Sequence, residues 1–274
     1  MKRFFRAIGS YVAAHLMRQR PVRVQAPAIN QQLQRILWNQ YVTAKSAGTP
    51  LFASLSGAGF RCYSQFEEDG IILYLLAIVG VKSRVVVEMC CGSGDECMAA
   101  NLIINHGFKG HLFDGAPHRV ARARRFFASH QECALEPPEI TCAWIDRDNV
   151  NELLRSSGVR GEVDVLSLDL DGNDFFIWQA IEAISPRICV FETHDIIPSE
   201  LSVTVPYDAH RDAASLKGPG HDFRSVSLAA MAKLSQQKGY TLVGSHRHGF
   251  NVFFLRNDLV GPCTPAVSVE SVHD

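Results

Sequence analysis

Apolar residues in this chain occur in two kinds of segment that follow one another along the sequence. One is a short uninterrupted run, and the other is a longer stretch with helical spacing. Uninterrupted runs begin near residues 85, 111, 140, 163 and 187. An apolar run without polar alternation is typical of a strand that is buried on both faces, as in a parallel sheet. Helical spacing predicts helices at 67–79, 96–106, 119–130, 150–157, 175–184 and 226–239. Strand and helix therefore alternate along most of the chain.

The end of the chain departs from this rhythm. Two further strands are predicted at 240–245 and 252–256, and only a short turn separates them. Such strands pair antiparallel, because a parallel pair needs a long crossover. The pattern predicts an α/β fold: a doubly wound, Rossmann-like sheet, mostly parallel, with an antiparallel last strand. Helical spacing at 31–47 predicts an N-terminal helical extension in front of it.

The segment 85–95 joins the first strand to a helix and is the most informative stretch of the sequence. Glu88 stands at the strand end, Gly92 and Gly94 lie in the turn, and Cys90 stands where a first glycine is common. Small residues let a ligand approach the backbone, and a helix start presents free N–H groups. This combination indicates a nucleoside-containing cofactor. A purely structural strand-to-helix turn is the alternative.

Acidic residues also stand at the ends of the later strands. They are Asp114, Asp146, Asp169 with Asp171, and Glu192. Open α/β sheets bind ligands at the carboxyl ends of their strands, and an acid after the second strand is where ribose hydroxyls are held. Because a carboxylate contributes little to a core, folding alone does not explain this repetition. The acids predict a polar ligand site along one edge of the sheet.

Six segments make the chain resemble the class I S-adenosylmethionine-dependent methyltransferases, specifically the FkbM-like branch. They are 63–72, 87–94, 112–115, 167–174, 190–194, and 238–243 with 251–256. Together they cover residues 63–259. The resemblance implies a methyltransferase domain that binds S-adenosylmethionine and methylates oxygen on a small molecule or glycosyl unit. It does not name the acceptor.

The same resemblance implies roles around the cofactor. Glu88, Gly92 and Gly94 are expected at its methionine end. Asp114 is expected at the ribose, and Asp146 or its neighbours beside the adenine. The remaining members of the expected cofactor-binding set are Ser64, Gln65, Cys90, Gly115 and Asp169.

The segment 63–66 precedes the first helix of the domain. By the resemblance it folds over the methionine end of the cofactor, with Gln65 as a polar contact. Ser64 also fits an ordinary helix N-cap, with Glu67 three residues on completing a capping box. Both interpretations stay open, because one serine can serve both.

The cluster of aspartates after the fourth strand holds the best candidates for chemistry. Crowded carboxylates raise one another's proton affinity, which makes a usable base, and a histidine is another. We expect Asp171, with His194, to prepare the acceptor for attack, while Asp169 mainly positions the cofactor. Such acids also suit Mg²⁺; a divalent metal is left open but not expected. Asp174 fits the cap of the following helix, where an acid suits the dipole.

Composition narrows the classes of function. Of 274 residues, 47% are hydrophobic, and the net charge of −1 offers no field that attracts nucleic acid. The eight cysteines have no zinc spacing and are expected to be free thiols in a reducing cytoplasm, with Cys142 and Cys189 buried. His246 and His248 stand in a hairpin turn and are expected to be exposed.

Residues 1–17 combine a basic start with an apolar middle. The apolar run is too short to span a bilayer. We expect an amphipathic helix that packs on the domain, with peripheral membrane contact through residues 1–20 as the alternative. The expected organisation is an N-terminal extension at 1–60, a methyltransferase-like domain at 61–262 and a tail at 263–274.

Residues 193–224 contain three prolines and no clear periodicity. A loop of that length inside a domain is usually functional, so we expect a substrate-binding lid. Two other functions stay open: a cofactor-binding scaffold or partner subunit without catalysis, and a nicotinamide-dependent oxidoreductase. The oxidoreductase is disfavoured because Cys97 occupies the position of the third glycine. Homo-oligomer formation is left open.

Overall fold

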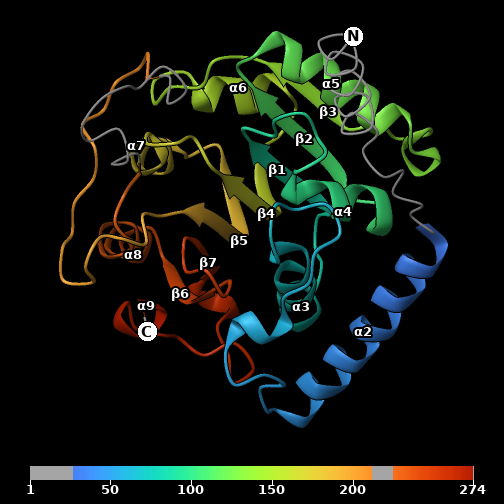
Figure 1. The fold of residues 1–274 in the computed structure, drawn as a ribbon, viewed down its shortest axis with the longest axis vertical. Helices are drawn as coiled ribbons and strands as arrows, with labels where there is room; N and C mark the ends of the chain where they lie inside the picture. The colour runs from blue at the N-terminus through green and yellow to red at the C-terminus, as the bar shows by residue number, and fades with distance from the viewer. Residues whose placement is uncertain (1–26, 212–224, 274) are drawn as a thin grey trace, which may run out of the picture. The chain divides into compact units, whose positions relative to one another are not determined.

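The computed structural model describes residues 27–211 and 225–273. Seven strands of these residues form one sheet in the order β3-β2-β1-β4-β5-β7-β6 (Figure 1). The strands are β1 (Val85–Met89), β2 (Lys109–Asp114), β3 (Glu139–Cys142), β4 (Gly161–Leu168), β5 (Ile184–Glu192), β6 (Tyr240–Ser245) and β7 (Asn251–Arg256). Pairs among β1 to β5 are parallel, and β7 runs antiparallel to β5 and β6. The predicted Rossmann-like sheet with an antiparallel end is confirmed.

The described helices are α2 (Pro27–Ala47), α3 (Glu68–Val79), α4 (Met98–His106), α5 (Pro117–Ala128), α6 (Val150–Ser156), α7 (Asp174–Ala180), α8 (Leu228–Gln237) and α9 (Glu270–His273). Those from α3 to α8 cover the two faces of the sheet (Figure 1). One core cluster includes α3, α4 and α5, and the other includes α6, α7 and α8. Val86 belongs to the first cluster and Val87 to the second, because successive strand side chains point to opposite faces. Burial on both faces explains why β1 lacks polar alternation.

The third strand ends earlier than predicted, at Cys142 instead of residue 146. Its only neighbour is β2, which ends at Asp114, the residue paired with Cys142. Beyond that point the chain has no strand to pair with. The end of this edge strand is open to solvent, so the expected burial of the Cys142 thiol is wrong, whereas Cys189 in the central β5 is buried.

Helix α7 also ends early, at Ala180 instead of residue 184. The Asn151 side chain accounts for this end, because its Nδ2 donates to the Ala180 carbonyl (2.7 Å). Its Oδ1 accepts from the backbone N–H groups of Glu182 and Ala183 (2.8 Å each). One asparagine thus satisfies the groups that the helix end exposes and leads the chain into β5.

Residues 36–274 form one compact unit and residues 1–35 another. In the larger unit, Tyr41 and Phe52 make edge-to-face contacts with Tyr74, whose hydroxyl donates to the Cys263 carbonyl (2.8 Å). Chain on both sides of the predicted domain therefore packs on its core. The predicted helix at 31–47 is confirmed as part of α2, and none of the described helices is long and apolar enough to cross a membrane. The expected amphipathic helix near the N-terminus lies outside the described residues.

The described part of the predicted lid, residues 193–211, contains turns and extended chain but no helix or strand. It is attached to the start of α8. Val203 N donates to Ser227 Oγ (3.0 Å), and Ser227 N donates to the Val203 carbonyl (2.9 Å). Residues 212–224 lie outside the described part of the chain, so that this segment acts as a lid stays a prediction.

Candidate functional site

The turn between β1 and α4 packs tightly at Gly94 and is open at Gly92. Cys90, Gly92 and Gly94 have φ angles of 72°, 58° and 83°. Such a backbone costs a residue with a side chain about 1–2 kcal/mol, so Cys90 is strained where glycine is not. A Cβ on Gly94 would lie 3.0 Å from the Phe126 ring, whereas one on Gly92 would meet nothing within 4 Å. The open space beside Gly92 is where a ligand can approach.

The Glu88 carboxylate accepts hydrogen bonds from the start of α4. Its Oε1 accepts from Met98 N (3.1 Å), and its Oε2 accepts from Ala99 N (2.6 Å) and from the Cys97 thiol (3.0 Å). Burial raises the pKa of Glu88 to about 7. The free N–H groups that the sequence offers to a ligand at this helix start are therefore used within the protein. Cofactor contact by Glu88 stays a prediction, and Cys97 has a structural role that the sequence did not reveal.

Asp114 ties the turn to the end of β2. Its Oδ2 accepts from Gly92 N (3.0 Å), and its Oδ1 accepts from Ala116 N (2.8 Å). The side chain is buried, and it holds the open Gly92 position beside the strand end. The geometry places the two residues expected at the ribose and at the methionine end in direct contact.

Trp144 is a neighbour of this site that the sequence analysis missed. A Cβ on Gly115 would lie 2.8 Å from the Trp144 ring, so glycine is required there. The indole N–H donates to the Ala209 carbonyl (2.6 Å), and the side chain is 47% exposed. A flat, half-exposed ring beside Asp114 suits a nucleoside. Its signal in the sequence was hidden, because residue 144 was assigned to a longer third strand.

Asp146 lies in the loop before α6 and not at a strand end. Its Oδ1 accepts from the backbone N–H groups of Asp148 and Asn149 (2.8 Å each). An aspartate that accepts from residues two and three positions on forms an Asx turn. Asp146 thus shapes the entry to α6, and its expected contact with adenine stays a prediction.

Ser64 is buried and bound to Asp69. Its hydroxyl accepts from Asp69 N (3.2 Å), and its own N–H donates to Asp69 Oδ2 (2.9 Å). The same carboxylate oxygen accepts from Cys62 N (2.7 Å) and Tyr63 N (2.6 Å). The predicted capping box is wrong, because Glu67 is the N-cap and no side chain caps α3. Asp69 organises this segment instead, and the cofactor role of Ser64 stays a prediction.

Asp169, Asp171 and Glu192 bring three carboxylates together at the ends of β4 and β5. One oxygen of each lies within 4.8 Å of the other two. Strand β4 ends at Leu168, so the two aspartates follow the strand and do not belong to it. They lie in a loop in which Asp171 has a φ of 51°. The sequence analysis noted Glu192 as a strand-end acid but did not include it among the site residues.

The protonation of this cluster follows from its burial. Burial first, and then the charge of the neighbouring carboxylates, raises the pKa of Asp169 and of Glu192. A raised pKa means that these carboxyl groups hold a proton more readily than in water, because a bound positive charge relieves the repulsion between them. The cluster therefore favours a positive charge, either a proton or a cation.

Asp174 stabilises the loop that carries the two aspartates. Its Oδ1 accepts from Leu170 N (2.8 Å), and its Oδ2 accepts from Gly172 N (3.0 Å). It stands in the first turn of α7, where its charge suits the helix dipole. Asn173 is the N-cap of this helix, and the Asp174 carboxylate binds N–H groups of the preceding loop instead. Burial raises the pKa of Asp174 to about 7.

A cavity of about 320 Å³ opens beside the carboxylate cluster. Its wall includes Gln65, Phe66, Asp171, Glu192, His194 and Phe250. Three predicted site residues, Gln65, Asp171 and His194, thus meet at one cavity from three separate segments. His194 lies past the end of β5, so strand alternation does not bring it there, and its Nδ1 lies 3.8 Å from Asp195 Oδ1. The cavity has room for a small acceptor next to candidate bases.

His246 is buried beneath this cavity, which contradicts the predicted exposure, whereas His248 is exposed as predicted. The His246 ring centroid lies 4.4 Å from that of Phe250, and its Nε2 lies 3.7 Å from Glu68 Oε1. Burial lowers the pKa of His246. The hairpin turn folds back over Phe66, a contact that no local pattern in the sequence indicates.

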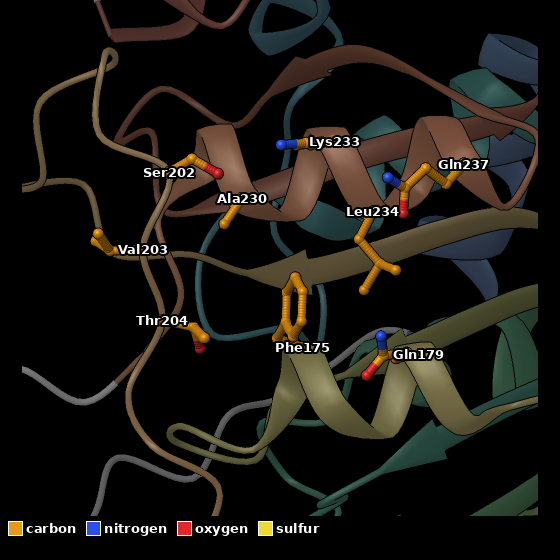
Figure 2. A pocket seen from close by; sticks show the side chains of 9 residues that line it. All are labelled: Phe175, Gln179, Ser202, Val203, Thr204, Ala230, Lys233, Leu234 and Gln237. Atoms are coloured by element: carbon orange, nitrogen blue, oxygen red, sulfur yellow. The ribbon is translucent and has the colours of Figure 1, made fainter.

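Figure 2 shows a second cavity, of about 220 Å³, between α7, α8 and the chain around Val203. Phe175 and Leu234 supply apolar surface, and Gln179 and Lys233 supply polar groups. None of the predicted site residues lines it. The chemistry expected from the sequence therefore belongs to the cavity beside Asp171.

No family model and no curated protein matches the sequence. Among solved structures, the chain is similar to the magnesium protoporphyrin IX methyltransferase of Synechocystis PCC 6803 with bound S-adenosylmethionine. That match has 13% identity and a TM-score of 0.42, and covers 69% of this chain and 77% of the other. A S-adenosylmethionine-dependent methyltransferase of Clostridium acetobutylicum matches with 12% identity and a TM-score of 0.42, over 67% and 87% of the two chains.

A third similar structure is the N-terminal domain of EvdMO1 with bound S-adenosylhomocysteine. It matches with 12% identity and a TM-score of 0.45, over 83% of this chain and 96% of the other. At these identities and TM-scores the matches carry no argument about function, and the Rossmann-like arrangement rests on the strand order of the sheet itself. The assignment to the FkbM-like branch stays a prediction.

Proposed function

We propose that the protein is a S-adenosylmethionine-dependent methyltransferase that methylates a hydroxyl oxygen of a small molecule or glycosyl unit. The observation that carries the proposal is the cavity that joins Gln65, Asp171 and His194. It lies at the carboxyl edge of the same sheet whose β1 turn and Asp114 form the expected cofactor side. The proposal therefore assigns a cofactor half and an acceptor half of the site to the same edge of the sheet.

The proposed cofactor site uses the open face of the turn. The methionine end lies beside Gly92, with Gln65 as a polar contact, and the ribose lies at Asp114. The Trp144 ring supports the adenine. Because Glu88 and Asp114 already accept backbone N–H groups, they preorganise the turn as well as carry charge.

The proposed reaction is a single displacement. The acceptor oxygen attacks the methyl carbon, the S–CH₃ bond breaks as the O–CH₃ bond forms, and S-adenosylhomocysteine is released. The hydroxyl proton passes to a base in the cavity wall, for which Asp171 and His194 are the candidates. An oxygen nucleophile is favoured because a hydroxyl must lose a proton, and the wall supplies groups that accept one. The enzyme is proposed to act in the cytoplasm, where its free cysteines stay reduced.

One observation favours a second function, a cofactor-binding scaffold without catalysis. Cys90 places a side chain in a left-handed turn position that glycine fills without strain. A site that no longer needs close cofactor approach tolerates this. The two functions differ in whether turnover accompanies binding.

The first test is calorimetry with S-adenosylmethionine, S-adenosylhomocysteine and NAD side by side. We expect both sulfur compounds to bind one to one and NAD to release no heat. Binding of NAD alone would transfer the proposal to an oxidoreductase. Once an acceptor screen finds turnover, Asp171→Asn should lower it by about 10²–10⁴-fold, the range for lost general acid–base catalysis. Binding without turnover on any acceptor class would favour the scaffold.

A further inference from the structure

The carboxylate cluster at the cavity wall gathers three acidic side chains at the ends of β4 and β5. Asp169, Asp171 and Glu192 each place one oxygen within 4.8 Å of the others. No lysine or arginine in the described ranges forms an ion pair with any of the three. Arg211 lies nearby, and its Nε donates to the Asp171 carbonyl (3.2 Å). Like charges this close together repel each other, so the cluster is stabilised by a positive partner.

A second, independent observation concerns Asn251, which is 2% exposed. Its Nδ2 donates to Glu68 Oε1 (2.7 Å). Because a carboxylate can only accept, the amide nitrogen must face Glu68, which leaves the amide oxygen on the other side. That oxygen has no hydrogen-bond partner among the described residues. A buried polar oxygen without a partner costs about 1–3 kcal/mol, so something outside these protein groups is needed to satisfy it.

The sheet register connects this oxygen to the cluster. Asn251 is paired directly with Glu192 between the antiparallel strands β7 and β5. Side chains at directly opposed positions project from the same face, with Cβ atoms about 4.5–5.5 Å apart. The unpartnered oxygen of Asn251 thus belongs to the same end of the sheet as the Glu192 carboxylate.

We propose that Asp169, Asp171, Glu192 and the side-chain oxygen of Asn251 bind a divalent cation that prefers oxygen, of the Mg²⁺, Mn²⁺ or Ca²⁺ class. A single proton shared by two carboxyl groups cannot also satisfy the amide oxygen, whereas one cation contacts all four groups. Carboxylate and amide oxygens are the ligands that these cations take, at about 2.0–2.6 Å. The spacing of the three carboxylates, at most 4.8 Å, suits that range.

The site deepens the proposed function but does not depend on it for binding. Asp171 and Glu192 line the cavity in which the acceptor is expected, so a cation there has open coordination positions toward the acceptor. A hydroxyl that binds such a cation loses its proton more readily. Only this role in activating the acceptor rests on the proposed methyl transfer.

The test is binding of Mn²⁺ to the full-length, chelator-stripped protein, followed by the electron paramagnetic resonance signal of free Mn²⁺. We expect saturable one-to-one binding that Mg²⁺ or Ca²⁺ displaces. Asp171→Asn should weaken binding by roughly tenfold or more, because affinity follows the ligand charge count. Asp195→Asn is the matched control: it is also an exposed aspartate of the same cavity wall, and it should change binding by no more than about twofold, since distant charges are screened.

Asn251→Ala tests the second observation, with the rise in melting temperature on adding Mn²⁺ as its readout. We expect a smaller rise than in the parent protein. If this buried variant does not fold, the comparison of Asp171 with Asp195 decides alone. Absence of Mn²⁺ binding at millimolar concentration, or equal losses in the two aspartate variants, would overturn the site. S-adenosylhomocysteine calorimetry on the same protein keeps the two proposals apart, since either ligand can bind without the other.

Discussion

The two ends of the β-sheet treat buried acids in opposite ways. At the amino ends of β4 and β5, Asp164 accepts backbone N–H groups of Lys82 (2.9 Å) and Arg84 (2.7 Å). It also lies 3.2 Å from Arg187 Nε. At the carboxyl ends, Asp169 and Glu192 face each other and Asp171, without an arginine or lysine of the described residues as an ion-pair partner. At the amino ends, the buried acid has an ion pair and backbone hydrogen bonds. At the carboxyl ends, the acids have no ion pair with a described lysine or arginine.

This difference separates structural acids from functional ones. A buried charge that is paired and hydrogen-bonded serves the fold. A cluster of like charges costs stability and is retained where it has another use. Asp69 is an intermediate case: it accepts three backbone N–H groups but has no ion pair in the described ranges. The three sites therefore form a series. Asp164 has both hydrogen bonds and an ion pair, Asp69 has hydrogen bonds alone, and the cluster at the carboxyl ends has no such ion pair and gathers like charges.

The largest expected effect on stability comes from removing the ion pair at the amino ends of the strands. Asp164→Ala should lower the free energy of unfolding by about 3–5 kcal/mol, because Arg187 loses the nearer of its two carboxylate partners and backbone N–H groups lose their acceptor. Asp171→Asn, at the opposite end, should not lower it and should raise it by up to about 1 kcal/mol, because it removes one of three neighbouring negative charges at an exposed position. Urea unfolding of both variants measures the pair. Equal destabilisation would contradict the division of roles.

The intermediate acid predicts a pH dependence. Burial raises the pKa of Asp69 to about 6 from an ordinary 3.8, against the lowering effect of its hydrogen bonds. A raised folded-state pKa contributes stability below pH 3.8 that is lost as the pH rises through 6. Stability relative to Asp69→Asn, which keeps an acceptor oxygen but does not titrate, should therefore fall by about 1–3 kcal/mol between pH 4 and pH 7. Urea unfolding at both pH values measures it.

The sign of this change discriminates between two physical effects. A difference that rises with pH would mean that the three N–H groups of Cys62, Tyr63 and Ser64 outweigh burial. A difference that does not vary with pH would mean that Asp69 titrates as in the unfolded chain. Only the predicted fall places Asp69 between the matched and unmatched acids.

The last expected effect concerns the cofactor side of the carboxyl end. Asp114→Ala should weaken binding of S-adenosylhomocysteine by about 1–3 kcal/mol, the scale of lost hydrogen bonds that involve a charge. Part of the loss comes from Gly92, whose N–H donates to this carboxylate (3.0 Å). Calorimetry on the folded variant measures the affinity, with Asp195→Asn as a control. Unchanged affinity would remove Asp114 from the cofactor site.

The sequence predicted the fold well because its signals were local. The uninterrupted apolar run at 85–89 and the short turn at 246–249 each depend on a few neighbouring residues, and both elements are confirmed. Errors arose at element ends. The third strand was predicted too long because apolar residues continue to Ile145, whereas a strand ends where its partner ends, and that partner is set by the sheet.

The candidate site was predicted in part for the same reason. Acids at strand ends can be recognised locally, so Asp114, Asp169 and Asp171 were found. Residues whose importance depends on a distant partner were not, as with Asn251, which matters through Glu192 and Glu68. His246 was assigned to an exposed turn because nothing nearby in the sequence shows that Phe250 and Glu68 enclose it.

By itself, the sequence determined the order of strands and helices, the antiparallel end of the sheet and the edge at which the acids gather. These properties follow from residue periodicity and from the rule that parallel strands end on one side. Only the tertiary structure decided which acids are matched and which are not. That depends on contacts between residues far apart in the chain, such as Asp164 with Arg187 or Glu192 with Asp169, and on burial, which sets the energetic cost of a charge without a partner.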